Sequence, residues 1–414
     1  MGYLTFVRRH ARLLAFGFAM AFFSAFGQTY FIAQYSADLR ALYGLSHSGF
    51  GVVYGLATLT SAALLVPVGA LIDRVPLRLY TMTVVLGLMI ATLIMAFAPP
   101  FSVIVLYAAI LLLRLCGQGL MTHIAVTTMA RRFERLRGRA ISLATMGHPA
   151  GEAMMPLATA AVVAAVGWRV SWAVVALVLV AVVAPLVLVL VSRNTARAAE
   201  SDETPVPQGP GRAEAERVAH ARSWTRAQML RDWRFYVLVP ALLGPGFINT
   251  AVFFAQVEIT AQKGWERLAF VAAIPVYAAA TVIMAFVTGF LIDRFTARRL
   301  FPLALLPLAS GMAVLGAGQE PPALALAMGL AGASQGLFGA LSGALWAELY
   351  GTAHLGAIRA LTTSLMVFST ALAPALMGVM FDVGGRIDTI ALFFSAYAVA
   401  AAGTAGFLWT RRSV

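Results

Sequence analysis

The chain has 414 residues, of which 61% are hydrophobic and only 11% are charged. A soluble chain averages about 25% charged residues, so this sequence cannot cover a water-facing surface of its size, and a soluble enzyme is excluded. The single cysteine, Cys116, cannot form an internal disulfide. The formal net charge of +13 indicates basic loops on one side of a membrane rather than binding to nucleic acid.

Apolar stretches long enough to span a bilayer, about 20 residues each, recur along the chain in two groups of six. The first group lies near residues 13–35, 48–72, 79–98, 101–126, 140–166 and 170–192. The second group lies near residues 235–257, 268–292, 300–319, 323–347, 360–381 and 389–410. This pattern predicts an all-α membrane protein with twelve transmembrane helices in two six-helix bundles.

A polar segment, residues 193–234, separates the two groups. It carries acidic residues, arginines and three prolines, a composition that cannot form a packed core. We interpret it as a linker between an N-terminal bundle, residues 1–192, and a C-terminal bundle, residues 235–414. Its end, residues 224–234, is predicted to form an amphipathic helix on the membrane surface.

The distribution of basic residues predicts the orientation. Of the 30 Lys and Arg residues, 24 fall on one side of the membrane: at the two termini, in the linker and in the loops after spans two, four, eight and ten. Five fall on the other side, and one lies inside a span. Cytoplasmic loops carry the excess of Lys and Arg in membrane proteins. We therefore expect a multi-pass protein of the inner membrane with both termini in the cytoplasm.

The two halves of the sequence repeat. The segment from Gly69 to Arg78 reads G-x-L-I-D-R-x-x-x-R, and the same pattern returns 220 residues later, from Gly289 to Arg298. Gln118-Gly119-Leu120 and Gln335-Gly336-Leu337 are related by an offset of 217 residues. Because parallel repeats of six spans build one large class of transporters, the bundles are predicted to be pseudo-symmetric.

The repeated loop resembles the signature between spans two and three of the major facilitator superfamily. The resemblance implies a secondary transporter that opens alternately to each side, with loop charges that bridge to neighbouring helix ends and close the cytoplasmic side. The alternative is that these charges only mark a cytoplasmic loop. The gate role would fall on Asp73, Arg74, Arg78, Asp293, Arg294 and Arg298.

A narrower resemblance begins at Phe133, where F-x-R-L-R-x-x-A-x-x-x-A-x-x-G looks like the fifth-span signature of monocarboxylate and oxalate/formate carriers. The sequence departs from that branch at Leu136 and Arg139. Residues 24–27 also lack the branch's acidic first-span motif, and the eighth span contains no Asp/Arg pair. The resemblance therefore implies no lactate assignment.

Two charged residues lie within predicted spans, where a charge costs about 2.5–3.5 kcal/mol on insertion scales. Arg114 is midway along span four, and Glu152 is midway along span five. His148 precedes Glu152 by one helical turn, and Gln118 follows Arg114 by one turn. Consecutive spans joined by a short loop are expected to lie side by side, so Arg114 and Glu152 are predicted neighbours.

Two interpretations of this cluster remain open. In the first, Arg114 binds a carboxylate of the substrate, because a guanidinium fork suits a planar two-oxygen anion, and Glu152 with His148 carries the coupled proton. In the second, a permanent Arg114–Glu152 ion pair fastens the two spans together. Uncharged polar residues that would complete a substrate pocket are Gln28, Tyr30, Gln118, Asn249 and Gln335.

The sequence thus favours a proton-coupled symporter of a small organic anion, expected to be a monomer in the lipid bilayer. An aromatic stripe on the first span, Phe22, Phe26 and Tyr30, favours the alternative of a bulkier aromatic or heterocyclic cargo such as a drug, vitamin or siderophore. A further alternative is a non-transporting receptor. No G-x-x-x-x-G-K-[ST] loop or Cys/His cluster occurs, so neither ATP nor a metal or other cofactor is expected.

Overall fold

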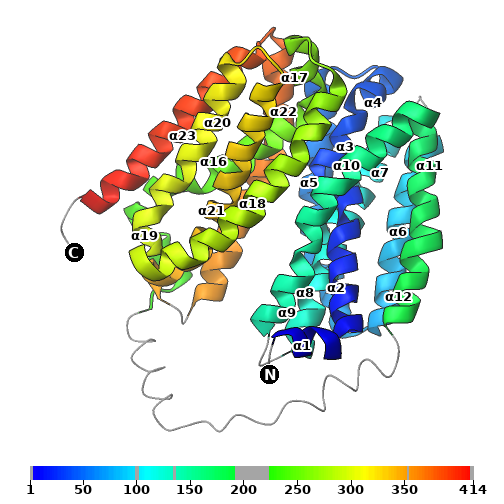
Figure 1. The fold of residues 1–414 in the computed structure, drawn as a ribbon, viewed down its shortest axis with the longest axis horizontal. Helices are drawn as coiled ribbons and strands as arrows, with labels where there is room; N and C mark the ends of the chain where they lie inside the picture. The colour runs from blue at the N-terminus through cyan, green and yellow to red at the C-terminus, as the bar shows by residue number, and fades with distance from the viewer. Residues whose placement is uncertain (1–2, 98–101, 134–136, 192–222, 352–353, 411–414) are drawn as a thin grey trace. The chain divides into compact units, whose positions relative to one another are not determined.

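The computed structural model describes residues 3–97, 102–133, 137–191, 223–351 and 354–410. Within these ranges every regular element is a helix. The chain divides into two compact units, residues 1–205 and 206–414. Each unit is a bundle of long helices (Figure 1).

Eleven of the described helices or helix runs are long and apolar enough to cross a membrane. A twelfth crossing is formed by a bent pair, residues 11–27 and 29–43, whose axes differ by 43°. The predicted fold of twelve spans is therefore confirmed, with one difference: the first span is broken in its middle.

In the first unit α1 (Tyr3–Arg9) precedes six crossings. The first contains α2 (Ala11–Phe23), η1 (Ser24–Gly27), α3 (Thr29–Ile32), η2 (Ala33–Tyr35) and α4 (Ser36–Tyr43); the second contains α5 (His47–Ala70) and η3 (Leu71–Asp73). The third is α6 (Leu77–Phe97), and the fourth contains α7 (Val103–Leu112), η4 (Leu113–Met121) and α8 (Thr122–Arg132). The fifth contains α9 (Arg137–Thr145) and α10 (Gly147–Val166), and the sixth contains α11 (Trp168–Val178), η5 (Leu179–Val183) and α12 (Ala184–Leu190).

The second unit begins with α15 (Arg226–Met229). Its first three crossings are α16 (Trp233–Phe254) with α17 (Gln256–Lys263), then α18 (Arg267–Phe295), then α19 (Ala297–Leu300) with η6 (Phe301–Leu305) and α20 (Leu306–Ala317). The last three are α21 (Pro322–Tyr350), α22 (Leu355–Asp382) and α23 (Ile387–Thr410).

The predicted surface helix at the end of the linker is not formed as expected. Most of the linker, residues 192–222, lies outside the described residues. In the rest, Thr225 begins α15 with a capping box, but Asp232 accepts a hydrogen bond from the Arg234 amide at 3.0 Å and begins α16. Two helix starts seven residues apart leave room for a single turn of helix between them.

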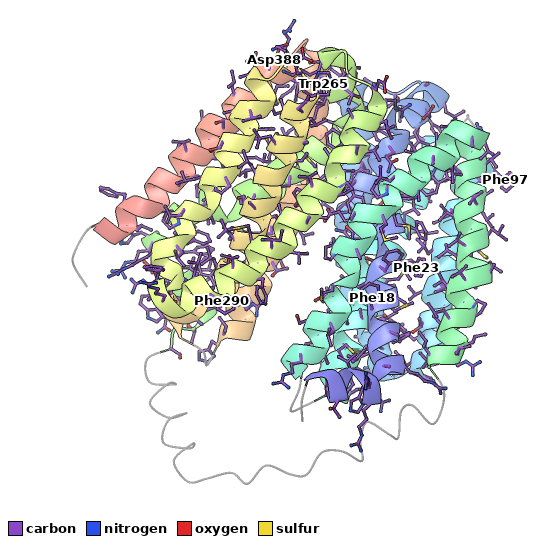
Figure 2. All side chains as sticks on the ribbon, viewed as in Figure 1. Phe18, Phe23, Phe97, Trp265, Phe290 and Asp388 are labelled. Atoms are coloured by element: carbon purple, nitrogen blue, oxygen red, sulfur yellow. The ribbon has the colours of Figure 1, made fainter. Side chains whose placement is uncertain are left out.

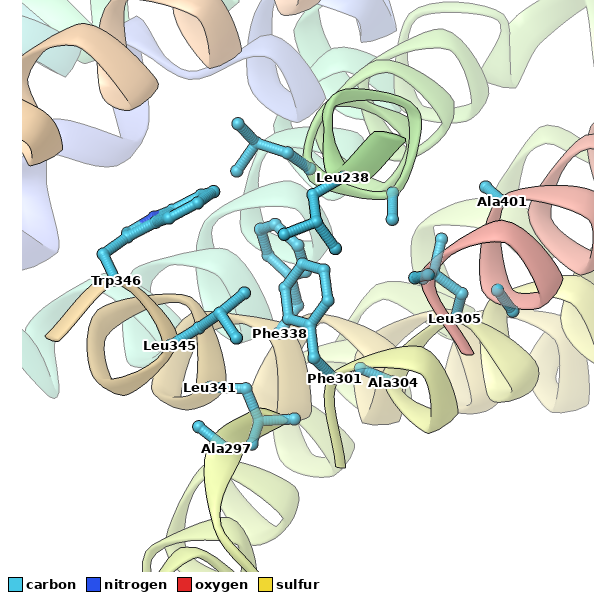
Figure 3. Close-up of a cluster of buried hydrophobic side chains, with 14 of the residues drawn as sticks. Leu238, Ala297, Phe301, Ala304, Leu305, Phe338, Leu341, Leu345, Trp346 and Ala401 are labelled. Atoms are coloured by element: carbon cyan, nitrogen blue, oxygen red, sulfur yellow. The ribbon is translucent and has the colours of Figure 1, made fainter. Parts of the chain in front are cut away.

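The core of the second unit is a layer of interlocking apolar side chains. Phe301 and Phe338 lie at its centre, with ring centroids 5.7 Å apart. Leu238 of α16 and Trp346 of α21 flank them, and Ala401 of α23 lies at the edge of the cluster (Figure 3). Because lipid tails are as apolar as these side chains, such contacts stabilise the bundle mainly through close packing.

Large apolar side chains also cover the outside of both units. Phe97 is 77% exposed and Phe290 is 64% exposed, and both extend away from their helices (Figure 2). In water such a surface would drive aggregation. On helices of spanning length it is the surface expected against lipid.

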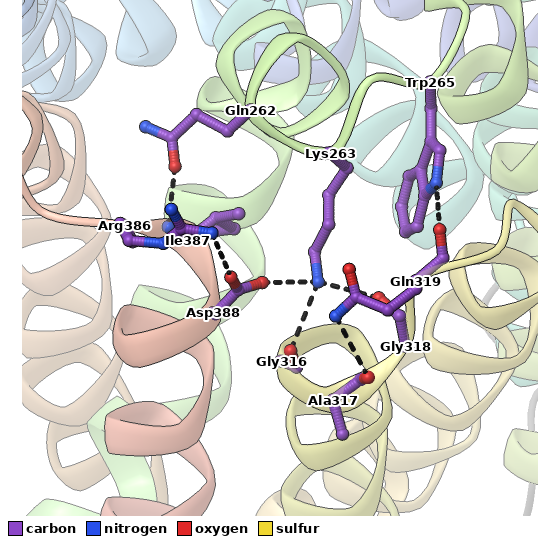
Figure 4. Close-up of polar contacts among 10 residues, drawn as sticks. All are labelled: Gln262, Lys263, Trp265, Gly316, Ala317, Gly318, Gln319, Arg386, Ile387 and Asp388. Carbon is purple, nitrogen blue, oxygen red and sulfur yellow. Dashed lines mark hydrogen bonds and ion pairs between the residues drawn. The ribbon is translucent and has the colours of Figure 1, made fainter.

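A buried lysine closes one end of the second unit (Figure 4). The Lys263 side chain is 2% exposed; its Nζ donates to the carbonyl oxygens of Gly316 and Gly318, at 3.2 and 2.7 Å, and lies 2.5 Å from Asp388 Oδ1. It thereby caps the C-terminal end of α20, where a cation is favourable, and ties it to the first turn of α23. Trp265 Nε1 donates to the Gln319 carbonyl beside it, at 2.8 Å.

Candidate functional site

The break in the first span lies at Gln28. Its backbone is extended, with φ −84° and ψ 154°, between the 3₁₀ turn η1 and the short helix α3. An extended residue interrupts the helical hydrogen bonds, and irregular backbone at membrane depth must find partners within the protein. Those partners come from the fourth span.

The fourth span meets the break with an irregularity of its own. Its central nine residues, η4, form a π-helix, a geometry often found at functional sites. The backbones of η1 and η4 touch: a Cβ added to Gly117 would lie 2.7 Å from Gly27 Cα. Only glycine fits at either position, so these two glycines set the distance between the spans.

Arg114 projects from η4 to the break. It is 3% exposed, and its Nη1 donates to the Gly27 carbonyl oxygen at 3.1 Å and to Thr29 Oγ1 at 3.2 Å. Its Cζ lies 5.4 Å from the ring centroid of Tyr54, in cation–π range. The Nε atom is buried without a hydrogen-bond partner among the described residues. The Nη1 atom of the guanidinium thus binds the residues on both sides of the break, while Nε makes no hydrogen bond to a described residue.

The predicted neighbours Arg114 and Glu152 do not pair. Among the described residues no ion pair joins them, because the first span lies between: η1 packs against both η4 and α10. The cause is a second pair of glycines, Gly147 and Gly151, which bring α10 onto the backbone of α2. The expectation that consecutive spans lie side by side at this depth is wrong.

Glu152 nevertheless lies in the same unit and is 7% exposed. Within the described part of the chain its carboxylate makes no hydrogen bond or ion pair. Tyr30 is 4% exposed on α3, which packs against α10. His148 is half-buried one turn before it on α10. The side chains of Gln28 and Gln118 make no hydrogen bond to any described residue.

The two candidates from the second unit form a pair. Asn249 Nδ2 of α16 donates to Gln335 Oε1 of α21 at 3.1 Å. Asn249 is buried and Gln335 is half-buried. The sequence placed these amides on two separate spans, and the structure brings them together within this unit.

At the loop after the second span, Asp73 forms an ion pair with Arg131 of α8. Arg131 Nη1 also lies 3.4 Å from the Ile72 carbonyl oxygen. Both side chains of the pair are about half exposed, so the pair alone adds little stability. Arg74 and Arg78 are exposed and make no ion pair with described residues.

The repeated loop in the second unit is held differently. The Glu348 carboxylate accepts hydrogen bonds from the backbone amides of Ala297 and Arg298, at 2.8 and 3.0 Å, and so caps the N-terminus of α19. The Arg294 guanidinium lies over the Phe295 ring, and the Asp293 side chain lies outside the described residues. Glu348 follows Arg131 by 217 residues, the offset that relates Gln118 to Gln335.

Sequence reasoning therefore missed several partners. Glu348 is not among the residues that the sequence singles out, although the repeat offset aligns it with Arg131. Thr29 and Tyr54 carry no charge and gave no signal of their own. Over the described residues, no group of three or more His, Cys, Asp or Glu side chains could hold a metal ion.

Comparisons with known proteins place this geometry in a family. A search of curated sequences found no match. The crystal structure of nucleoside transporter NupG is similar, with a TM-score of 0.71 and 14% identity over 98% of this chain and 100% of that one. The structure of an aspartate-to-alanine mutant of that transporter gives 0.71 and 13% over 97% and 100%.

At such low identity these structures show the fold alone. The sequence itself carries the family: residues 17–278, more than half of the chain, match the profile described as Major Facilitator Superfamily. Neither comparison singles out the monocarboxylate or oxalate/formate branch. The chain belongs to the major facilitator superfamily and is a multi-pass membrane transporter, not an enzyme.

Proposed function

We propose that this transporter moves a small organic anion of the carboxylate type across the inner membrane, coupled to a proton, by alternating access. Both termini would face the cytoplasm, and the protein would act as a monomer. The observation that carries the proposal is the state of Arg114, a buried cation whose binding edge is incompletely used.

The two protons of Arg114 Nη1 are directed to Gly27 and Thr29. The side-on edge, formed by Nε and Nη2, makes no hydrogen bond within the described part of the chain, and no acidic side chain lies within ion-pair distance there. Two parallel N–H groups match the two oxygens of a carboxylate. A buried charge without a counter-charge is costly, and an anionic substrate would supply that counter-charge.

Glu152, with His148 beside it, is the proposed proton site. A buried carboxylate is costly in its charged form when it has no cationic partner, which suits a group that takes up and releases a proton during the cycle. Because η1 lies between Glu152 and Arg114, substrate and proton would be coupled through the broken first span rather than through a direct ion pair.

The proposed gates lie at the two repeated loops. In the first unit the Asp73–Arg131 ion pair joins the end of span two to the end of span four. In the second unit the Glu348 cap joins α19 to the end of α21. Contacts of this kind break and re-form without rearranging the core, as a gate requires.

One observation favours the alternative of an aromatic or heterocyclic cargo. On α2 the rings of Phe18 and Phe22 are stacked with centroids 6.1 Å apart, and neither is buried. A flat molecule would extend such a stack. The similar solved structures are those of a nucleoside transporter, so nucleosides belong among the compounds to be tested.

The test is uptake into proteoliposomes that contain the full chain, with acetate, pyruvate, benzoate and succinate beside uridine and adenosine. We expect uptake of at least one carboxylate, accelerated by an inward proton gradient. Arg114→Ala should abolish this uptake, and Arg114→Lys should lower it by at least about tenfold, because lysine lacks the bidentate fork.

The control is Arg386→Ala, since Arg386 is 75% exposed and directly precedes α23 of the second unit. It should transport like the wild type. Uptake of the nucleosides alone, or carboxylate uptake that survives Arg114→Ala in correctly folded protein, would contradict the proposal.

A further inference from the structure

The broken first span holds Arg114 through one hydroxyl that is shared by three spans. Thr29 Oγ1 accepts a hydrogen bond from Arg114 Nη1 at 3.2 Å and another from Tyr54 Oη at 3.0 Å. A threonine hydroxyl has two acceptor lone pairs, and both are used here. Tyr54 belongs to α5 and Arg114 to η4, so the hydroxyl joins spans one, two and four.

The same three residues fix the orientation of the guanidinium. Nη1 has two protons, and both are held, one by Thr29 and the other by the Gly27 carbonyl. The ring of Tyr54 covers one face of the group at 5.4 Å. A planar group held along one edge and on one face keeps its remaining edge, Nε and Nη2, in a single direction.

We infer that Thr29 and Tyr54 are positioning residues, which set the affinity for an anion at Arg114 without contacting the anion. This inference rests on the proposed function of Arg114. Affinity gained by preorganising a binding group is lost when that group is free to turn. The cost should therefore appear in the KM for the anion and much less in kcat.

Two variants separate the parts of the arrangement. Tyr54→Phe removes the hydroxyl that orients Thr29 but keeps the ring over the guanidinium. Thr29→Val removes the acceptor itself and has nearly the same shape as threonine. We expect each to raise the KM by about fivefold, the value for one hydrogen bond, with kcat within about twofold. Thr29→Ser keeps the hydroxyl and should restore the KM.

A matched control lies in the same bundle. Tyr107 Oη donates to Thr60 Oγ1 at 2.8 Å, a tyrosine–threonine hydrogen bond between α7 and α5 that does not involve Arg114. Tyr107→Phe should therefore leave the KM unchanged. An equal rise of the KM in Tyr107→Phe would show a general loosening of the bundle and would overturn the inference.

The measurement is initial uptake into proteoliposomes, over a range of concentrations of whichever of acetate, pyruvate, benzoate and succinate the wild type transports fastest. Size-exclusion chromatography confirms that each variant is folded. If Arg114→Lys impairs uptake but Tyr54→Phe and Thr29→Val do not change the KM, the positioning role is wrong and the proposed function stands. If Arg114→Lys has no effect, or the wild type transports none of the four acids, the proposed function fails and this inference fails with it.

Discussion

Among single side chains, Glu152 tests the proposed coupling most directly. Its buried carboxylate makes no ion pair with a described residue, so removal of its proton-binding ability should change coupling more than folding. We expect Glu152→Gln to exchange substrate across the membrane but to lose acceleration of uptake by a proton gradient.

Counterflow and pH-jump uptake in the same vesicles measure these two properties. Glu320→Gln is the control, since Glu320 is exposed in the loop between α20 and α21, and it should keep the full response to pH. A Glu152→Gln variant that still responds to the gradient would remove this carboxylate from the coupling mechanism.

At this scale the sequence singled out individual polar residues but not the contacts that they make. Arg114, Glu152, Asn249 and Gln335 stood out because polar groups are rare in spanning segments. The acceptor of Arg114 did not, because the Gly27 carbonyl oxygen is a backbone group present at every residue, and only the break in the helix frees it from its usual i+4 amide donor. The place of each side chain in the transport cycle stays a prediction.

At the scale of elements, the contact between η1 and η4 depends on the absence of two side chains. Gly117→Ala would place a methyl group 2.7 Å from the Gly27 Cα, which is backbone and cannot rotate away. Overpacking of this kind costs about 1–3 kcal/mol. We expect a lower melting temperature of the purified protein in detergent and a higher KM for the anion.

The matched variant is Gly403→Ala on α23, where an added Cβ would meet no atom within 4 Å. It should melt at the wild-type temperature. Equal melting temperatures for Gly117→Ala and wild type would mean that the spans can separate freely at this contact.

At one end of the second unit, a buried cation and an exposed cation pair with the same carboxylate, that of Asp388. Their contributions to stability can therefore be compared. Lys263 and Arg386 both pair with Asp388, but their side chains are 2% and 75% exposed. Lys263→Met also removes the cap on α20, and should destabilise the unit by about 2 kcal/mol. Arg386→Ala should cost less than about 1 kcal/mol.

Thermal unfolding followed by tryptophan fluorescence measures the difference, since Trp265 donates a hydrogen bond within this network. Equal effects of the two variants would show that burial of the lysine is energetically unimportant. The existence of the spans was predictable from hydropathy, whereas this network was not, because it joins the ends of three helices that are far apart in the sequence.

At the scale of the whole molecule, the twelve crossings and the parallel repeat followed from the sequence, since both depend on patterns tens of residues long. The break in the first span did not. Residues 24–32 contain neither a proline nor a charged residue, and the break lies where the first span packs against spans four and five, contacts that no local pattern reveals. Tertiary packing decided the local geometry here.

The orientation predicted from basic loops has a direct test. In a Cys116→Ser background, we expect Glu320→Cys to react with a membrane-impermeant maleimide in right-side-out vesicles. Arg231→Cys should react only after the vesicles are permeabilised. Both positions are exposed, so reactivity reports their side of the membrane, and the opposite result would contradict the distribution of arginines.

The charge reversal between Arg131 and Glu348 implies that the two halves of the carrier differ in their sensitivity to electrolyte. Mobile ions shield two half-exposed side chains from each other, so a high salt concentration would weaken the contact after the second span. A carboxylate that is hydrogen-bonded to two backbone amides depends less on ionic strength, because short hydrogen bonds contribute beside the screened charge. Two units that share one repeated loop would thus respond unequally to a change in electrolyte concentration at equivalent positions.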